Sequence, residues 1–289
     1  MVLATSSYVA TAQNNSKNGH QITPETGDWG IGIDVDPIFN YVGNMFNGTS
    51  DNSSPSWNFV NNSPIPMTIT GFMMKDETTA CRGKIRIGFG SNKETNFVDD
   101  DLDTLGIPTR KLSDERKTSS TNILIGLGIQ KMRGKHRVKG IYGAEVLFGL
   151  TGGKTTYDYG NAMTITNQSP VSTVESSWDS STPYSAAASS RTTENKSGTG
   201  LYVGLRGFIG AEYFFAPKIS VAGEFGWGVG FSSVGEGEIT TQFVDNTGII
   251  PQVRNVGEKS GKSSSFGVDT DTGNSFGSPS GSLRMTFYF

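Results

Sequence analysis

The sequence predicts an all-β fold, an eight-stranded antiparallel transmembrane β-barrel with short turns at one end and long loops at the other. Three observations predict it. Apolar residues recur at every second position in eight runs between Asp28 and Phe289, opposite glycine or polar residues. Short and long connections alternate between these runs. The even number of runs brings the end of the chain back to the side on which the first run began.

The composition favours this class over a water-soluble domain. Apolar residues make up 34% of the 289 residues, which is low for a protein that must bury a large core in water. A barrel whose apolar residues face lipid does not need such a core. The formal net charge of −3 argues against a nucleic-acid-binding protein, because such proteins carry a strongly basic face. No run of 18 apolar residues occurs, so no transmembrane helix is predicted.

The few cysteines and histidines predict neither a disulfide nor a bound metal. Cys81 is the single cysteine, and His20 lies far in sequence from the other histidine, His136. Two acidic runs begin at Asp99 and Asp269, but neither has the spacing of an EF-hand loop. We therefore expect solvated acidic loops, no metal and no cofactor.

The N-terminal segment resembles the end of a signal peptide. The segment 1–12 is mildly apolar and ends in Ala10-Thr11-Ala12, the small-residue pattern at which signal peptidase cleaves. The alternative is an ordinary N-terminal tail. We expect residues 1–12 to be a remnant of a signal peptide, 13–26 a periplasmic arm and 27–289 the barrel.

The first four strands are predicted at 28–36, 66–74, 81–89 and 122–130. Each alternates large apolar residues with glycine, hydroxyl or charged residues, as a strand with two different faces does. The apolar side consists of Trp29, Ile31, Ile33 and Val35 in the first run, Cys81, Gly83, Ile85, Ile87 and Phe89 in the third, and Ile123, Ile125, Leu127 and Ile129 in the fourth.

The last four strands are predicted at 142–150, 201–214, 219–231 and 282–289. The final run ends the chain on an aromatic residue, and it must pair with 28–36 if the barrel is to close. The apolar side consists of Tyr142, Ala144, Val146, Phe148 and Leu150, then Leu201, Val203, Leu205, Ile209 and Tyr213, then Ile219, Val221, Phe225, Trp227, Val229 and Phe231, and lastly Leu283, Met285, Phe287 and Phe289.

The connections predict the two ends of the barrel. Short turns are expected at 75–78, 133–137 and 216–218. The long connections are rich in Ser, Thr, Asn, Asp and Gly and are expected as loops at 47–64, 91–120, 151–199 and 233–280. Loops this long are uncommon in compact soluble domains but typical of the external side of outer-membrane barrels.

The composition of the two strand faces decides which one points outward. The second face consists mainly of Gly, Ser, Arg and Glu, which are too small and polar for a soluble core. A soluble lipocalin-like barrel would place its large residues inside, so we expect the apolar face to meet lipid. Aromatic residues near strand ends are expected at the membrane interfaces; they are Trp29, Tyr142, Tyr213, Phe214, Phe215, Phe231 and Phe287.

With these residues the chain resembles the eight-stranded outer-membrane barrels of Gram-negative bacteria, the OmpA/OmpX-like group. The resemblance rests on "GDWGIGIDVDP", on the hairpin "MTITGFMMKDETTACRGKIRIGFG" and on the terminal "LRMTFYF", and covers about residues 27–289. It implies a bacterial outer-membrane location with both termini periplasmic. It also implies that Phe287 and Phe289 form a signal for the barrel-assembly machinery. No peptidoglycan-binding domain is carried over.

The inward face is predicted to hold a charge network. An eight-stranded barrel leaves an interior that side chains fill, so opposite charges there are expected to pair and plug it. The alternatives are a narrow ion path opened by exchange of pairs and, less favoured, a catalytic carboxylate pair. The predicted members are Asp34, Asp36, Arg82, Lys84, Arg86, Glu145, Arg206, Glu212, Glu224 and Arg284.

Aromatic residues in the long loops are the candidates for binding. Loops held by a rigid scaffold commonly carry binding, and aromatic residues among Ser, Gly and Asn suit adaptable surfaces. The alternative is that these loops extend the sheet and cover the barrel mouth. The candidates are Tyr157, Tyr159, Trp178, Tyr184, Phe243 and Phe266.

These observations predict a structural or binding protein and not an enzyme. G-x-S-x-G is absent, and Gly149–Thr156 lacks the first glycine of a phosphate-binding loop. The expected partners are outer-membrane lipid, the assembly machinery and either an extracellular ligand or another outer-membrane protein, with no nucleic acid. The alternatives are a noncatalytic subunit of a larger outer-membrane complex and a narrow channel for ions or small solutes.

Overall fold

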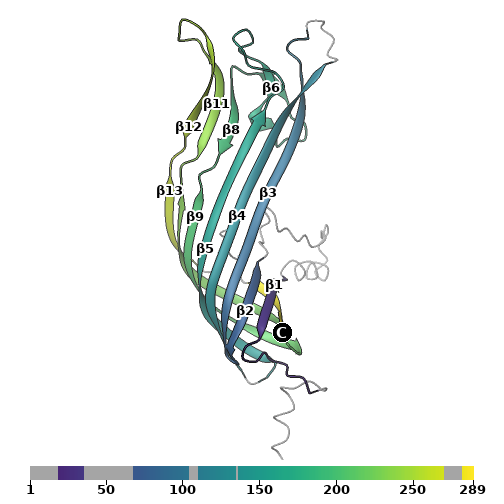
Figure 1. Ribbon diagram of the computed structural model, residues 1–289, viewed down its shortest axis with the longest axis vertical. Helices are drawn as coiled ribbons and strands as arrows, with labels where there is room; N and C mark the ends of the chain where they lie inside the picture. Colours follow the sequence, from purple (N-terminus) through teal and green to yellow (C-terminus); the bar gives the residue numbers. More distant parts are fainter. Residues whose placement is uncertain (1–18, 36–67, 104–109, 135, 270–281) are drawn as a thin grey trace, which may run out of the picture.

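The computed structural model describes residues 19–35, 68–103, 110–134, 136–269 and 282–289, and most of these residues lie in antiparallel β-strands (Figure 1). Eight strands form a closed ring in the order β1, β2, β3, β4, β5, β9, β10, β14 and back to β1. Their bounds are β1 Trp29–Asp34, β2 Ile69–Asp76, β3 Thr79–Asp99, β4 Lys111–Arg133, β5 Val138–Asp158, β9 Gly200–Ala216, β10 Ile219–Val234 and β14 Ser282–Tyr288.

The ring closes where the sequence predicted. β1 pairs with β14 in antiparallel register from Gly30 opposite Tyr288 to Asp34 opposite Arg284. All eight predicted strands are present and in the predicted order. The three short connections lie at one end, which we call the base of the ring, and they comprise 77–78, 134–137 and 217–218. Among the described residues, no helix is long and apolar enough to span a membrane.

The register shows how strongly the strands are staggered. The stagger is seen by following directly opposite residues from strand to strand around the ring, on a line perpendicular to the strands. Starting at Ser220 on β10, this line passes through Thr286, Gly32, Thr70, Lys84, Gly126, Leu147 and Gly204. It returns to β10 at Gly230, ten residues from where it left. This stagger fixes the strand tilt at about 40° for eight strands. It also sets the height at which each inward side chain lies.

The predicted faces of the strands are confirmed by burial. Large apolar residues of the ring are exposed on its outer side, while the alternate positions point inward and are mostly buried. Val35, predicted with the outer residues of the first run, is buried instead. Phe214, predicted at a membrane interface, points inward and is fully buried, because it shares the parity of Glu212 on β9.

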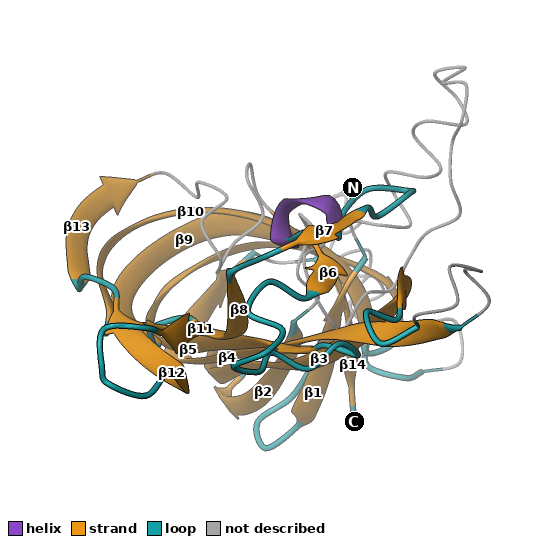
Figure 2. Ribbon diagram, turned by 90° about the horizontal axis from the view of Figure 1, so that it is seen from above, coloured by secondary structure: helices purple, strands orange, loops and turns teal. Residues whose placement is uncertain are grey.

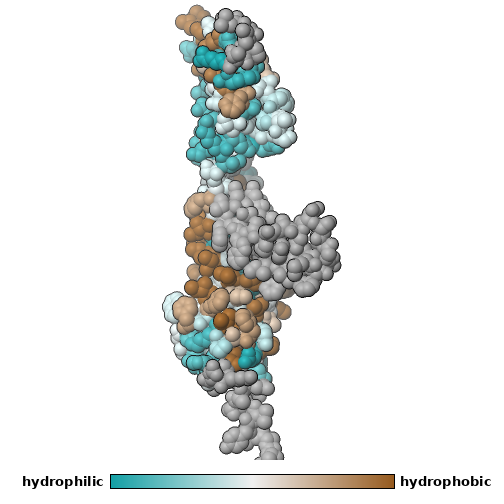
Figure 3. All heavy atoms as spheres, turned by 90° about the vertical axis from the view of Figure 1, so that its right-hand side faces the viewer, coloured by the Kyte–Doolittle hydropathy of each residue, from teal (hydrophilic) through white to brown (hydrophobic). Residues whose placement is uncertain are grey.

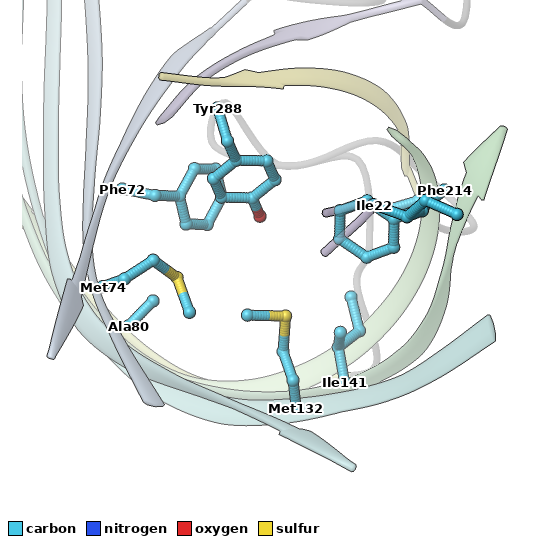
Figure 4. Packing of buried hydrophobic residues seen from close by; sticks show 9 residues of the cluster. Ile22, Phe72, Met74, Ala80, Met132, Ile141, Phe214 and Tyr288 are labelled. Atoms are coloured by element: carbon cyan, nitrogen blue, oxygen red, sulfur yellow. The ribbon is translucent and has the colours of Figure 1, made fainter. Parts of the chain in front are cut away.

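Phe214 belongs to an apolar cluster that fills the base of the ring (Figure 4). This cluster corrects the expectation of a uniformly small and polar interior. Ile22 reaches it from the segment before β1, where the amide of Lys218 donates a hydrogen bond to the Ile22 carbonyl oxygen (2.9 Å). The cluster consists of Ile22, Phe72, Met74, Ala80, Met132, Ile141, Phe214, Ala222 and Tyr288.

The long connections are mostly strands, which corrects their prediction as loops. β3, β4 and β5 run far beyond the ring, so 91–99, 111–120 and 151–158 continue the sheet. β8 (Ser190–Lys196), β11 (Glu238–Asp245) and β12 (Gln252–Lys259) extend it sideways, and β13 (Ser263–Asp269) pairs with the upper part of β10. Both faces of these extensions hold polar residues, so no apolar alternation marks them in the sequence. The predicted loop 47–64 lies outside the described residues.

The segment 159–190, which we call the cap, folds back over the inner side of this tall sheet (Figure 2). It contains β6 (Val171–Thr173), a single 3-10 turn (Glu175–Ser177) and β7 (Ser185–Ala187). The side-chain amide of Asn96 on β3 donates a hydrogen bond to the hydroxyl oxygen of Thr173 (3.0 Å), which ties β6 to the sheet. The molecule is therefore a short closed ring that carries a tall curved sheet with a cap against its inner face.

Candidate functional site

Six charged side chains meet inside the ring, and we call them the charge network. They come from five strands and all occupy inward positions of the alternation: Arg82, Lys84, Glu145, Arg206, Glu224 and Arg284. Each was predicted there, and the structure brings them together. The network lies directly above the apolar cluster at the base, so two layers close the interior among the described residues.

Glu224 on β10 is the most heavily paired member. Both terminal nitrogens of Arg82 donate hydrogen bonds to its carboxylate, one to each oxygen, at 2.8 Å each. Arg284 donates from Nη1 at 2.9 Å, and Arg206 donates from Nη1 at 3.1 Å. A buried carboxylate is stable when its oxygens accept several hydrogen bonds from cations in this way.

Glu145 on β5 is the second carboxylate. It lies 3.2 Å from Lys84 Nζ and 2.9 Å from Arg206 Nη1, with Arg82 Nε at 3.4 Å. Arg82 and Arg206 therefore each contact both glutamates. This sharing joins the six side chains into one cluster across the ring.

Two phenylalanine rings support the arginines of the network. The guanidinium carbon of Arg82 lies 4.4 Å from the ring centroid of Phe208, and that of Arg284 lies 4.6 Å from the ring centroid of Phe72. Aromatic faces attract cations, especially away from water. Sequence reasoning missed both phenylalanines, although each stands at an inward position of its own alternating run.

Three other predicted members lie apart from the network. Glu212 accepts hydrogen bonds from Ser220, from Tyr288 (3.0 Å) and from Gln130 (3.4 Å) near the base. Asp34 accepts hydrogen bonds from the amide and the hydroxyl of Thr68, at 2.9 and 2.7 Å. No carboxylate among the described residues pairs with Arg86. Asp36 lies outside the described residues.

Above the ring, the buried side chain of Asp114 holds the cap on β4. Its carboxylate accepts hydrogen bonds from the amide of Gly160 (2.8 Å) and from the amide and hydroxyl of Thr173 (2.6 and 2.8 Å). On the other side of the cap, Arg191 of β8 donates to the Asn161 carbonyl oxygen (2.8 Å) and to Ser172 (3.0 Å). Asp114 could have been predicted from the sequence, because it lies on the same inward face of β4 as Leu124, ten residues further from the base.

Three of the predicted binding aromatics meet where the cap joins the tall sheet, Tyr157 from the end of β5 and Tyr159 and Trp178 from the cap. Tyr157 and Tyr159 stack with centroids 6.2 Å apart and planes 8° apart, and Trp178 lies 6.4 Å from Tyr157. Arg191 covers the Tyr159 ring at 4.4 Å, and Arg116 lies 5.7 Å from the Trp178 ring. These contacts fasten the cap to the sheet. Trp178 is buried and Tyr157 and Tyr159 are partly buried, so the three rings do not form an open surface.

The ionisable groups of this region are perturbed by their surroundings. Burial, reinforced by the Glu175 carboxylate, raises the pKa of Tyr157 to about 12. The hydrogen bond from Arg116 to Asp179 (2.6 Å) lowers the pKa of that exposed carboxyl below its usual value. Arg116 thus links β4, through Asp179, to the turn that carries Trp178.

The remaining predicted aromatics are dispersed. Tyr184 is exposed on the cap, and Phe243 is half-buried on β11. Phe266 is exposed on β13 opposite Phe231, where it extends the outer apolar face. Phe287 and Phe289 are exposed on that same face at the base. The six loop candidates therefore do not form one site.

Comparison of the chain with models of protein families and with curated proteins gave no match. Among the described residues, no group of three or more His, Cys, Asp or Glu side chains is placed to hold a metal ion.

Proposed function

We propose that this protein is an outer-membrane β-barrel whose closed ring crosses the lipid bilayer. In this proposal the base faces the periplasm, and the tall sheet and its cap stand outside the cell. The protein serves a structural or binding role through that external part, without catalysis. Lipid and the barrel-assembly machinery are its general partners, and Phe287 and Phe289 belong to the signal that the machinery reads.

One observation carries the proposal, the inversion of polarity across the ring. The outward positions of the ring carry large apolar side chains and no charge from Thr79 to Ser91 on β3 and from Leu201 to Phe215 on β9. The inward positions hold the charge network. Figure 3 shows the apolar band on the lower half and polar residues above it. Water on the outside would favour the opposite arrangement.

The interior favours a plug over a channel or a catalytic site. Each glutamate of the network is held by at least three cations, which leaves neither one free to act as a base. The apolar cluster closes the base below them. Binding is therefore assigned to the external sheet and cap, where Tyr184 and Asp179 are exposed. A ligand or another outer-membrane protein is the expected partner.

A matched pair of substitutions tests the membrane assignment. Leu127 and Phe97 are outward-facing and similarly exposed, at 60% and 66%, but Leu127 lies in the apolar band and Phe97 lies high on the tall sheet. In lipid vesicles, Leu127→Arg should lower the free energy of unfolding by about 2–4 kcal/mol. Phe97→Arg should change it by less than about 0.5 kcal/mol. Equal effects of the two substitutions would contradict the proposal.

A further inference from the structure

Above the apolar band, the outward positions of four neighbouring strands begin with the same kind of charge. On β3, β4 and β5 the last large apolar residue is followed only by Ser, Thr or Gly until the first charged residue, which is a lysine. On β8 the outward residue nearest the ring is also a lysine, directly opposite the one on β5. We call these side chains the lysine patch; they are Lys93, Lys117, Lys154 and Lys196.

Acidic residues on the same side lie farther from the apolar band. On each of the four strands the next charged outward residue is an acid: Asp99 on β3, Glu115 on β4, Asp158 on β5 and Glu194 on β8. This face therefore runs from apolar residues through small polar ones to lysines, and only then to acids. A positive layer next to an apolar band is the order that an anionic lipid surface favours.

The lysines of the patch stand opposite one another in pairs. Lys93 lies directly opposite Lys117, and Lys154 lies directly opposite Lys196. Like charges at directly opposite positions destabilise a sheet. All four side chains are exposed, so an anion from outside the chain can reach them.

Only one lysine of each pair has an acidic partner among the described residues. The Glu115 carboxylate lies 2.8 Å from the ammonium group of the β3 lysine, and the Glu194 carboxylate lies 2.9 Å from that of the β5 lysine. Glu238 of β11 stands opposite Lys196 on its other side, but no ion pair joins them. Lys117 and Lys196 are thus the cations that the acids of the described sheet leave over.

The stagger of the strands brings the patch to one height. Lys154 is two residues nearer the base than Thr156, which stands opposite Lys117. The perpendicular line itself climbs as it passes from β3 to β5, since it gains ten residues over the eight strands. The step toward the base is therefore offset by the climb. The patch runs level above the apolar band, as contact with a membrane surface requires.

We propose that the lysine patch binds the phosphate groups of anionic lipids in the membrane leaflet on the side of the tall sheet. This inference rests on the proposed function, because it requires the apolar band to lie in a bilayer. Long lysine side chains can extend along the sheet toward the headgroups. A phosphate between two opposite ammonium groups relieves their repulsion and accepts charged hydrogen bonds. The two exposed ion pairs contribute little, so they do not prevent this binding.

Spin-labelled lipids test the patch with the full chain folded in phosphatidylcholine vesicles. Labelled phosphatidic acid and labelled phosphatidylcholine each report the fraction of lipid immobilised at the protein surface. We expect a preference for phosphatidic acid that weakens as salt rises. The labels average over the whole circumference of the ring, so Lys117→Gln combined with Lys196→Gln should reduce the preference by about twofold.

The matched control is Lys111→Gln combined with Arg254→Gln. It also removes two exposed cations, but these lie high on the tall sheet, where they pair with Asp99 and Asp245. The control should leave the lipid preference unchanged. Inorganic phosphate added at constant ionic strength should also leave it unchanged. If free phosphate abolishes the preference, the lysines bind phosphate from solution and the lipid assignment is wrong.

The difference between the two double variants is the decisive quantity, because basic residues at the base such as Lys131 also meet lipid. Immobilised lipid without a preference, or an equal preference in the two variants, would overturn the inference while leaving the ring in the bilayer. Absence of immobilised lipid of either kind would contradict the proposed function, and this inference with it.

Discussion

Glu224 shows how one side chain can support a whole interior. It is the carboxylate shared by Arg82, Arg206 and Arg284, which come from three different strands. Each of those arginines was brought out of water, and much of that cost is offset by this carboxylate, with Glu145 as the second partner of Arg82 and Arg206. The stability of the ring therefore depends more on this residue than on any single cation around it.

Glu224→Gln should lower the free energy of unfolding by about 3–5 kcal/mol, because it leaves the buried Arg82 and Arg284 and the partly buried Arg206 around a neutral amide. Urea unfolding in detergent micelles, followed by tryptophan fluorescence, measures the change. Glu238→Gln on β11, an exposed position, is the control and should have little effect. A loss below about 1 kcal/mol for Glu224→Gln would show that the network does not hold the ring together.

Tyr157 gives a pH dependence whose direction follows from its pKa. Burial and then Glu175 raise that pKa to about 12, above the value of 10.0 for a free tyrosine. The contribution of the neutral phenol to stability is therefore complete below pH 10 and is lost as the pH rises through 12. Ultraviolet titration of the folded protein should show late phenolate formation that Tyr157→Phe reduces by one tyrosine, since burial also raises the pKa of Tyr159. Unchanged titration curves would contradict the burial of Tyr157.

For single residues, the sequence predicted which face of its strand each charged residue occupies, but not its height along the axis of the ring. Alternation placed Arg86, Glu212 and Asp34 correctly on the inside of the ring. It could not show that they lie apart from the network, because height depends on the stagger between strands distant in sequence. Arg82 meets Glu224 across 142 residues of chain, which no local pattern records.

Among the elements, the pairing of β1 with β14, which we call the seam, depends on close packing. A Cβ atom at Gly32 would lie 2.5 Å from Cδ and 3.0 Å from Cγ of Arg284. Arg284 cannot move aside easily, because its Nη1 is bound to Glu224. The glycine therefore allows the arginine to lie flat across the first strand.

Gly32→Ala should destabilise the ring by about 1–3 kcal/mol through this overlap. Gly83→Ala on β3 is the control, since a Cβ there meets only Leu127 at 4.0 Å. Its effect should be small, or stabilising by about 0.5 kcal/mol. Unfolding by urea and the temperature at which the folded band disappears on a gel both report the difference. Similar values for the two substitutions would show that the seam tolerates a side chain.

The eight ring strands were predictable because each has one apolar and one polar face. The upper strands were not, since β8, β11 and β12 carry polar residues on both sides and resemble loops in composition. Their pairing is set by the strands beside them, as where β11 aligns with β8 and β12. Tertiary context of this kind overrides local composition.

For the whole molecule, the two closed layers predict how the protein behaves in a bilayer. The apolar cluster and the charge network each fill the interior among the described residues. Planar-bilayer recording should therefore show no steady conductance at moderate voltage. Brief openings are compatible with the exchange of ion pairs. A large and steady conductance would show that the plug is not the resting state and would favour the narrow-channel alternative.

The seam also has a consequence for how the chain folds. β1 and β14 pair over five positions, and their residues are separated by nearly the whole chain, with Gly30 opposite Tyr288. Closing so long a loop costs configurational entropy that few contacts repay. Contacts of this kind form late and slowly. Until they form, β1 and β14 are open strand edges, so we expect assembly to be limited by how long those edges can be protected from pairing with other chains.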